Sequence, residues 1–230
     1  RKRFAFEEVF FIQLKKQEER EKTKHENSYK IVVDDKDITD FVSRFPFKHT
    51  SAQEKAIKQI LEDFKKDYPM SRLLEGDVGS GKTAVAATAS YAIIKNRPYD
   101  KAKDKIQTYG SLQVAYMAPT EILATQLFEN FIKYFAHTGI NIGLITGSGC
   151  RKFPSKIESS KMTGGYTNIS RTQLLKWVEN GEIPILIGTH TLIQKSVKFK
   201  HLGLVIIDEQ HRFGTLQRSK LAKKVGKVEM

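Results

Sequence analysis

The chain has 230 residues, 40% of them hydrophobic, so it is long enough to bury the core of one large domain or two small ones. No apolar run approaches the roughly 20 residues that cross a bilayer, so no membrane-spanning helix is expected. The net charge of +13 favours a polyanionic partner such as nucleic acid, although the same surplus would also serve solubility. Cys150 is the single cysteine, which rules out an internal disulfide and fits a reducing cytoplasm.

Residues 1–49 are predicted to form a helical lead-in to the main domain. The chain begins without Met or an apolar signal segment, so we expect it to be the interior of a longer polypeptide. Apolar side chains recur at helical spacing at Phe6, Val9, Phe10 and Leu14. The mixed charges that continue to residue 26 indicate a solvated helix face. A short strand is predicted at 31–33, and one or two helical turns at 37–43.

From residue 50 onward, helices and strands alternate. The predicted helices are one with Ile57, Ile60, Leu61 and Phe64 on one face, then 83–94, 123–135 and 170–180, the last with Ser170 as its cap and Gly181 at its end. The predicted strands span 72–74, 114–117, 140–145, 185–187 and 204–207. The alternation predicts an α/β domain over 50–230, with a parallel sheet between two layers of helices. Two polar, Lys-rich segments, 96–111 and 147–169, are predicted to be mobile surface insertions.

A glycine-rich motif lies between the strand predicted at 72–74 and the following helix. It fits the pattern G-x-x-x-x-G-K-[ST] with Gly76, Asp77, Val78, Gly79, Ser80, Gly81, Lys82 and Thr83. The glycines let backbone N–H groups point at phosphate oxygens, and the helix that starts near Lys82 adds its positive end. Lys82 is predicted to reach the β- and γ-phosphates of a nucleotide, and the Thr83 hydroxyl to bind Mg²⁺.

Two adjacent carboxylates follow the apolar strand at 204–207. An isolated pair of this kind more often opens a solvated loop, because like charges repel and lose hydration when buried. With a phosphate loop in the same chain, Asp208 is placed to hold Mg²⁺ through a coordinated water. Glu209 is placed to polarise the water that attacks the γ-phosphate. The pair therefore predicts hydrolysis of a nucleoside triphosphate, with Lys82 as a further catalytic residue.

Asp208-Glu209-Gln210-His211 resembles the DExH box of superfamily-two helicases. The strings RLLEGDVGSGKTAVA, MAPTEILATQ, IGTHTLIQ and LGLVIIDEQHRFG are similar to the RecG family of bacterial ATP-dependent DNA helicases, and the likeness runs over residues 1–222. The resemblance implies a RecA-like domain that binds ATP and Mg²⁺ in the bacterial cytoplasm. It also implies a helicase that remodels branched or forked DNA in repair and recombination.

The resemblance also assigns roles to single residues. Gln53 would contact the adenine edge, and His211 would couple the nucleotide state to DNA. The residues implied to grip the phosphates of one DNA strand through amides and hydroxyls are Pro119, Thr120, Glu121, Thr146, Gly147, Gly188, Thr189 and His190. Two alternatives stay open at this point. Thr50 and Gln53 also fit a capping box, and each Thr is equally suited to cap a helix or a turn.

The chain ends before the family's next motif, so the resemblance implies the first lobe of a two-lobe motor. A second RecA-like lobe with an arginine finger and a wedge domain that splits branched DNA would belong to the same parent chain. Residues 1–230 alone are expected to be monomeric and nearly inactive in ATP hydrolysis. Two rivals stay open: a duplex-DNA translocase of the transcription-repair coupling type, and a regulatory nucleotide-binding module without turnover. Glu209 speaks against the module, because binding alone needs no water-activating residue.

Overall fold

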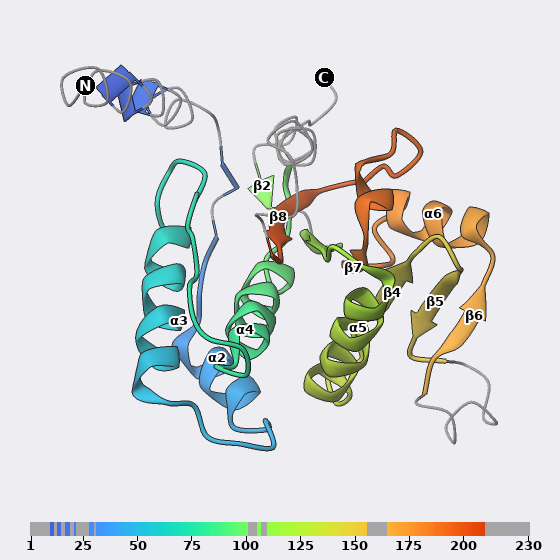
Figure 1. The fold of residues 1–230 in the computed structure, drawn as a ribbon, viewed down its shortest axis with the longest axis horizontal. Helices are drawn as coiled ribbons and strands as arrows, with labels where there is room; N and C mark the ends of the chain where they lie inside the picture. The colour runs from blue at the N-terminus through green and yellow to red at the C-terminus, as the bar shows by residue number, and fades with distance from the viewer. Residues whose placement is uncertain are drawn as a thin grey trace, which may run out of the picture.

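A six-stranded mixed sheet forms the centre of the computed structural model, which describes residues 10–11, 13–14, 17–18, 21, 28–29, 31–100, 105–106, 110–155 and 165–209. In sheet order β6-β5-β4-β7-β3-β8, its strands are β6 (Thr167–Ile169), β5 (Cys150–Phe153), β4 (Ile142–Ile145), β7 (Ile185–Gly188), β3 (Gln113–Met117) and β8 (Leu202–Ile207) (Figure 1). Strands β4, β7, β3 and β8 run parallel, and β5 and β6 continue the sheet antiparallel. The carboxyl ends of the four parallel strands therefore share one edge of the sheet, called the carboxyl edge below.

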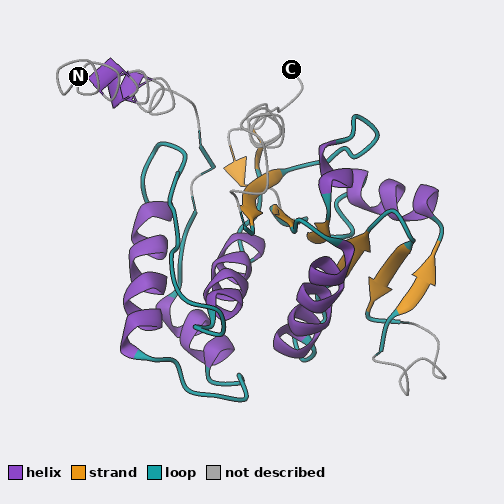
Figure 2. Ribbon diagram, viewed as in Figure 1, coloured by secondary structure: helices purple, strands orange, loops and turns teal. Residues whose placement is uncertain are grey.

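Helices cover both faces of this sheet (Figure 2). They are α2 (Asp35–Val42), α3 (Ser51–Phe64), α4 (Lys82–Ile94), α5 (Glu121–Phe135), α6 (Arg171–Glu179) and the 3-10 helix η2 (His190–Ile193). The first four share one hydrophobic cluster with Val114 and Leu144 of the sheet, and α6 and η2 share a second cluster with Met117 and Leu186. The predicted α/β class with helices on both faces is confirmed, but the sheet is mixed and not wholly parallel as predicted, because β5 and β6 pair antiparallel. None of the described helices is long and apolar enough to cross a membrane.

Local signals in the sequence explain where the helices begin. The hydroxyl of Thr50 accepts from the Gln53 amide, and the Gln53 side chain accepts from the Thr50 amide, so a capping box starts α3. The Ser170 side chain caps α6, and Gly181 follows its end at φ 80°, a conformation that favours glycine. Helix α4 is rich in Ala and buried along most of its length, which lets it lie directly against β3 and β8. The starts of α3 and α6 and the end of α6 match the sequence prediction.

Gln113 lies at the start of β3, at the edge of the sheet opposite the carboxyl edge. Its side chain bonds to the chain segments that lead into β7 and β8. Its side chain is fully buried, and its Nε2 donates to the carbonyls of Val178 and Ile183, each at 2.9 Å. Its Oε1 accepts from the amides of Lys200 at 2.8 Å and His201 at 3.0 Å. One amide therefore ties the segments that enter β7 and β8 to the first residue of β3, and all of its hydrogen-bonding groups are used.

The lead-in is partly described. Phe6, Val9 and most of the charged stretch to residue 26 lie outside the described residues, whereas Phe10 and Leu14 are helical and exposed. Helix α2 confirms the helical turns predicted at 37–43, and it buries Ile38 in the main core.

The strand predicted at 31–33 is wrong. The Val32 amide donates to Asn96 Oδ1 at 2.7 Å, and the Val32 carbonyl accepts from Asn96 Nδ2 at 2.9 Å. Val32 is exposed. A side-chain amide therefore takes the place that a neighbouring strand would occupy, and this segment runs as an extended connection.

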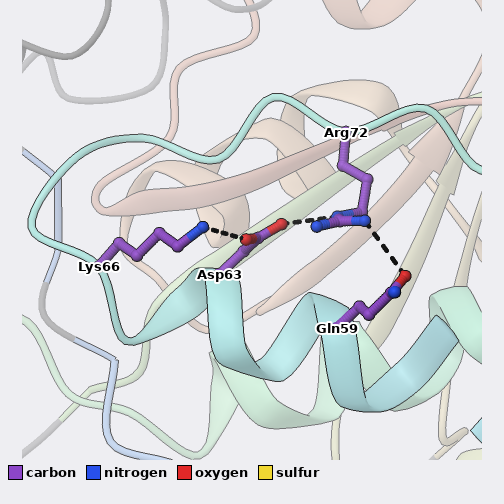
Figure 3. A network of polar contacts seen from close by, with 4 residues as sticks. All are labelled: Gln59, Asp63, Lys66 and Arg72. Atoms are coloured by element: carbon purple, nitrogen blue, oxygen red, sulfur yellow. Dashed lines mark hydrogen bonds and ion pairs between the residues drawn. The ribbon is translucent and has the colours of Figure 1, made fainter. Parts of the chain in front are cut away.

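The strand predicted at 72–74 is also wrong, because the segment is tied to α3 by side chains and joins no strand of the sheet. Arg72 Nε donates to Asp63 Oδ2 at 2.6 Å, and an Arg72 guanidinium nitrogen donates to Gln59 Oε1 at 3.3 Å (Figure 3). Lys66 Nζ donates to the other Asp63 oxygen at 2.6 Å. Leu73 is exposed. The approach to the glycine-rich loop is therefore positioned by polar contacts with a helix.

The two Lys-rich segments contain regular structure. In 96–111, β1 (Tyr99–Asp100) and β2 (Lys105–Ile106) form a short antiparallel pair. In 147–169, β5 pairs with β4, and β6 pairs with β5, so this segment extends the main sheet. Its polar sequence hid these strands, because an edge pair has too few buried positions to produce an apolar alternation. Residues 156–164, between β5 and β6, lie outside the described part of the chain.

Candidate nucleotide site and nucleic-acid interface

The glycine-rich loop leads from the extended segment at 71–75 into the first turn of α4. Gly79 and Gly81 adopt φ of 82° and 81°, which residues with a Cβ rarely adopt. The Ser80 amide donates to the Asp77 carbonyl at 3.1 Å and closes a turn within the loop. Residues 75–80 are exposed, and Gly81, Lys82 and Thr83 are half-buried at the start of the helix. The loop thus presents backbone groups to solvent beside a helix N-terminus, the arrangement that suits a phosphate.

The Lys82 ammonium lies within this loop. Its Nζ donates to the carbonyls of Gly76 at 2.6 Å and Asp77 at 2.8 Å. These contacts hold the cation among the residues that the sequence assigns to phosphate binding. Carbonyl acceptors are weaker partners for an ammonium than a phosphate, because only the phosphate oxygens carry an opposite charge. The residues present therefore fit a nucleotide phosphate.

Gln53 belongs both to the helix cap and to the loop. Besides its capping-box bond, its Nε2 donates to the Ser80 carbonyl at 2.7 Å. A Cβ added to Gly81 would lie 2.3 Å from the same nitrogen and would displace the end of the Gln53 side chain, and the φ of 81° at this position also favours glycine. The capping alternative left open by the sequence is therefore observed, and the same side chain also contacts the loop. An adenine contact by Gln53 stays a prediction.

The acidic pair follows β8 at the carboxyl edge. The Asp208 amide donates to the Met117 carbonyl at 2.9 Å, which continues the pairing of β8 with β3. Glu209 adopts φ 49°, and its amide donates to Asp208 Oδ1 at 3.0 Å. Gln210 and His211 lie outside the described residues.

Burial, followed by the charge of Glu209, raises the pKa of Asp208, although the Glu209 amide and the charge of Lys82 act in the opposite direction. Asp208 also contributes to the raised pKa of Tyr116, after burial. Burial disfavours the charged form of the Asp208 carboxylate, and a bound cation would offset that cost. Asp208 and the Thr83 hydroxyl are therefore suitable ligands for Mg²⁺. Among the described residues, no group of three or more His, Cys, Asp or Glu side chains is arranged to hold a metal by itself.

The residues implied to contact DNA meet at the carboxyl ends of β3, β4 and β7. Glu121 Oε1 accepts from the Gly147 amide at 2.8 Å. Hydrogen bonds from the Ser148 hydroxyl and from the amides of Gly147 and Ser148, with the nearby charge of His190, lower the pKa of Glu121 against the effect of partial burial. One carboxylate therefore connects the start of α5 with the turn after β4 and the start of η2. Ser148 was missed by the sequence analysis, since no motif includes it.

The hydroxyls of Thr120 and Thr146 in this cluster form hydrogen bonds with backbone groups of the protein itself. The Thr120 hydroxyl caps α5 by accepting from the Leu123 amide at 3.3 Å. The Thr146 hydroxyl donates to the Gly149 carbonyl at 3.0 Å. Thr146 is 5% exposed and Thr189 is 2% exposed. Helix and turn capping is thus observed for Thr120 and Thr146, and in this conformation the hydroxyls of Thr146 and Thr189 do not face solvent.

The remaining implied DNA residues divide between surface and interior. Gly147 and His190 are exposed, Pro119 is half-buried, and Gly188 is buried. A Cβ at Gly188 would lie 2.5 Å from the Ile145 carbonyl, so this glycine allows β7 to approach β4 closely. The surface that remains for a ligand consists of the exposed Thr120, Gly147, Ser148 and His190 around the half-buried Glu121.

Comparisons with known proteins agree with this geometry. The family model for DEAD/DEAH box helicases matches residues 50–229. The ATP-dependent DNA helicase RecG of Aquifex aeolicus is 42% identical over 223 residues, which are 97% of this chain and 24% of that protein. A solved structure of RecG bound to a three-way DNA junction matches with a TM-score of 0.69 and 36% identity, over 93% of this chain and 25% of that one.

The UvsW helicase from bacteriophage T4 shares the fold at 16% identity, with a TM-score of 0.51 over 86% of this chain and 58% of that one. The chain spans about a quarter of the length of the RecG proteins that it matches. On its family model, its fold and its similarity to RecG, the chain belongs to the DEAD/DEAH box helicase family.

Proposed function

We propose that residues 50–230 form the ATP-binding lobe of an ATP-dependent DNA helicase of the RecG type, entered through a lead-in at 1–49. The observation that carries this proposal is the glycine-rich loop at 76–83, which holds the Lys82 ammonium at the start of α4 and places Gly79 and Gly81 in the conformation that favours glycine. The RecG relatives and the solved RecG complex with a DNA junction support branched DNA as the substrate.

The chain's own residues divide the work at the nucleotide. MgATP supplies the γ-phosphoryl group whose transfer to water releases the free energy used by the motor. Lys82, which bonds to loop carbonyls in this conformation, would bind phosphate oxygens, and the amides of 79–83 would orient the phosphates at the start of α4. Asp208 and Thr83 would hold Mg²⁺. Glu209 would orient the attacking water, and its backbone amide, which donates to Asp208 Oδ1, helps to hold the Asp208 carboxylate in place. Gln53 faces the adenine beside the loop, and His211 carries the nucleotide state toward DNA.

The carboxyl edge provides the surface for one DNA strand. Its exposed groups around Glu121, Gly147 and His190 lie beside the start of α5, whose N-terminus favours anions. Such contacts are made to phosphates and carry no base sequence. The net charge of +13 also attracts the negatively charged DNA over distances longer than a direct contact. We therefore propose binding that depends strongly on salt and weakly on sequence.

Completion of the motor requires further parts. The RecG relatives are about four times as long as this chain, which leaves room for a second RecA-like lobe with an arginine finger and for a wedge domain. Such a finger contributes about 10³–10⁵ in rate. Residues 1–230 alone are therefore expected to bind MgATP modestly and hydrolyse it very slowly.

The test is Glu209→Gln in the protein that carries this chain. We expect ATP hydrolysis to fall by about 10²–10⁴ while nucleotide affinity is kept, because the substitution removes a general base and leaves the loop untouched. Reversal or unwinding of a model DNA fork should be lost in parallel. Glu182→Gln, an exposed change remote from the carboxyl edge, is the control and should keep both activities. A Glu209→Gln protein that still remodels forks would point to a nucleotide-binding module without a need for turnover.

A further inference from the structure

A groove of about 310 Å³ lies between α5 and the strands β5 and β6. Its lining includes Thr125 of α5, Leu144 of β4, Arg151 of β5 and Asn168 of β6. Leu144 pairs with Arg151, and Arg151 pairs with Asn168, so these three residues form a row across adjacent strands. Figure 1 shows α5 beside this part of the sheet. The inserted segment at 147–169 thus builds one wall of a defined cavity.

The alternation of side chains along β5 separates two cations. The Arg151 guanidinium lies 5.2 Å from the centre of the Tyr166 ring, and Tyr166 in turn packs against Phe128 of α5. Lys152, the next residue, lies 5.8 Å from the ring centre of Trp177 on α6, which covers the opposite face of the sheet. Arg151 therefore belongs to the α5 side and Lys152 to the α6 side. Two neighbouring positive charges on one strand face different surroundings.

The groove carries groups that suit a phosphodiester. Arg151 is its charged residue, and Thr125, Ser148 and Asn168 add two hydroxyls and an amide. Within the described part of the chain, no carboxylate forms an ion pair with Arg151. A guanidinium that rests on an aromatic ring is held in place and keeps its N–H groups directed outward, which favours two-pronged recognition of phosphate oxygens. The apolar floor at Leu144 suits the sugar next to such a phosphate.

The groove opens at the turn after β4, next to the candidate DNA surface. Thr146, Ser148 and Gly149 of this turn line it, and Ser148 also bonds to Glu121 on that surface. Glu121 adds a negative charge beside this turn, and the Gly147 amide that donates to it offsets part of that charge. Ser148 and Gly149 of the turn line the groove together with Arg151, so a strand bound at Gly147 lies next to the groove.

We propose that the groove binds a backbone phosphate of the nucleic-acid strand, so that the inserted strands β5 and β6 lengthen the DNA path beyond the carboxyl edge. This proposal rests on the proposed function, since it assumes that a strand crosses that edge. It gives the Lys-rich segment at 147–169 a binding role. The key residue is Arg151, assisted by Asn168 and Ser148.

The test compares Arg151→Gln with Lys152→Gln in the protein that carries this chain. Both remove one positive charge from the same strand, but on opposite faces of the sheet. Binding to forked DNA is measured from 50 to 200 mM salt. For Arg151→Gln we expect the slope of log K against log salt to fall by about one, the share of one phosphate contact. Lys152→Gln should leave the slope near that of the unaltered protein, and ATP hydrolysis without DNA should be unchanged in both.

A second variant and a modified DNA guard against effects on folding. Asn168→Asp introduces a negative charge at an exposed position and should weaken DNA binding more than Asn168→Ala does. A fork in which single phosphates are replaced by neutral methylphosphonates should show one position whose replacement weakens the unaltered protein and leaves Arg151→Gln unaffected.

If Arg151→Gln and Lys152→Gln lowered the salt slope of DNA binding equally, the proposal would be overturned. That result would show that DNA responds to the overall positive charge and not to the groove. A normal slope for Arg151→Gln would overturn it as well. Failure of the unaltered protein to bind forked DNA at all would instead remove the proposed function on which the groove depends.

Discussion

The two halves of the carboxyl edge are built differently. At the nucleotide half, residues 75–80 are exposed, Lys82 is held by loop carbonyls, and Asp208 is a carboxylate with a raised pKa. At the DNA half, the turn after β4 is closed by its own hydrogen bonds and by Glu121. At the nucleotide half, Lys82 and Asp208 would exchange their present surroundings for a phosphate and a cation. At the DNA half, the hydrogen bonds that shape the turn are already formed. The difference indicates that nucleotide binding reorganises local contacts and that strand binding uses a preformed surface.

Lys82→Ala tests the nucleotide half and should have the largest effect. Removal of the ammonium leaves the loop without its phosphate partner, so ATP affinity should fall more than about tenfold, worth ~1.4 kcal/mol. The measurement is equilibrium ATP binding by calorimetry in the protein that carries this chain. Lys95→Ala, at the other end of α4, is the matched control and should bind ATP normally. A loss smaller than tenfold would contradict the assignment of 76–83 to phosphate binding.

Glu121→Ala tests whether the DNA half is preformed. Removal of a negative charge ordinarily strengthens DNA binding, but here it also releases the Gly147 amide and the Ser148 hydroxyl from the partner that positions the turn. We expect affinity for forked DNA to fall about threefold to tenfold, while ATP affinity without DNA stays unchanged. Glu129→Ala on the same helix removes an equal charge outside this cluster and should not weaken binding. Tighter DNA binding by Glu121→Ala would show that the turn needs no such support.

Asp63→Asn tests the support beneath the nucleotide half and should have the smallest effect. Burial alone would raise the pKa of Asp63, but hydrogen bonds from Arg72 and Lys66 and their charges outweigh it and lower the pKa. A lowered pKa means that the carboxylate stabilises the fold above its unfolded pKa of about 3.8, and that this stabilisation is lost as the pH falls through the folded pKa.

The Asp63→Asn variant should therefore lose up to about 1 kcal/mol of unfolding free energy at pH 7, because its partners are solvent-screened. This corresponds to about 2–4 °C in Tm. The deficit should shrink in thermal melts below pH 4. Asp67→Asn, an exposed neighbouring change, serves as control. A deficit that is the same at pH 3 and pH 7 would exclude the ionic contribution.

The sequence predicted those parts of the fold that rest on strong local or periodic signals. Helix α3 combines a capping box with an apolar stripe, and β7 is an unbroken apolar run, so both were correctly placed. The strand at 72–74 failed because a strand also needs a neighbour, and apolar residues such as Leu73 and Leu74 do not reveal whether one exists. Strands β5 and β6 were not predicted, because their polar residues give no strand pattern: β5 forms by pairing with the free side of β4, and β6 by pairing with β5.

The candidate site followed the same rule. Motifs with fixed spacing, such as 76–83 and 208–209, were found because their chemistry depends on adjacent residues. The bond between Glu121 and Gly147 joins positions 26 residues apart and has no signature in the sequence. The row formed by Leu144, Arg151 and Asn168 likewise depends on strand register. Contacts of this kind become visible only once the chain is folded.

Gln113 sets a limit on where this protein can change shape. Opening the connections that it joins would strand two buried donors and two buried acceptors, and each unsatisfied group costs about 1–3 kcal/mol. Such a penalty approaches the total stability of a typical domain, about 5–15 kcal/mol. The edge that holds Gln113 is therefore expected to resist rearrangement more strongly than the loops at the opposite edge. Hydrogen exchange should show slower exchange for the amides of Lys200 and His201 than for those of residues 76–80.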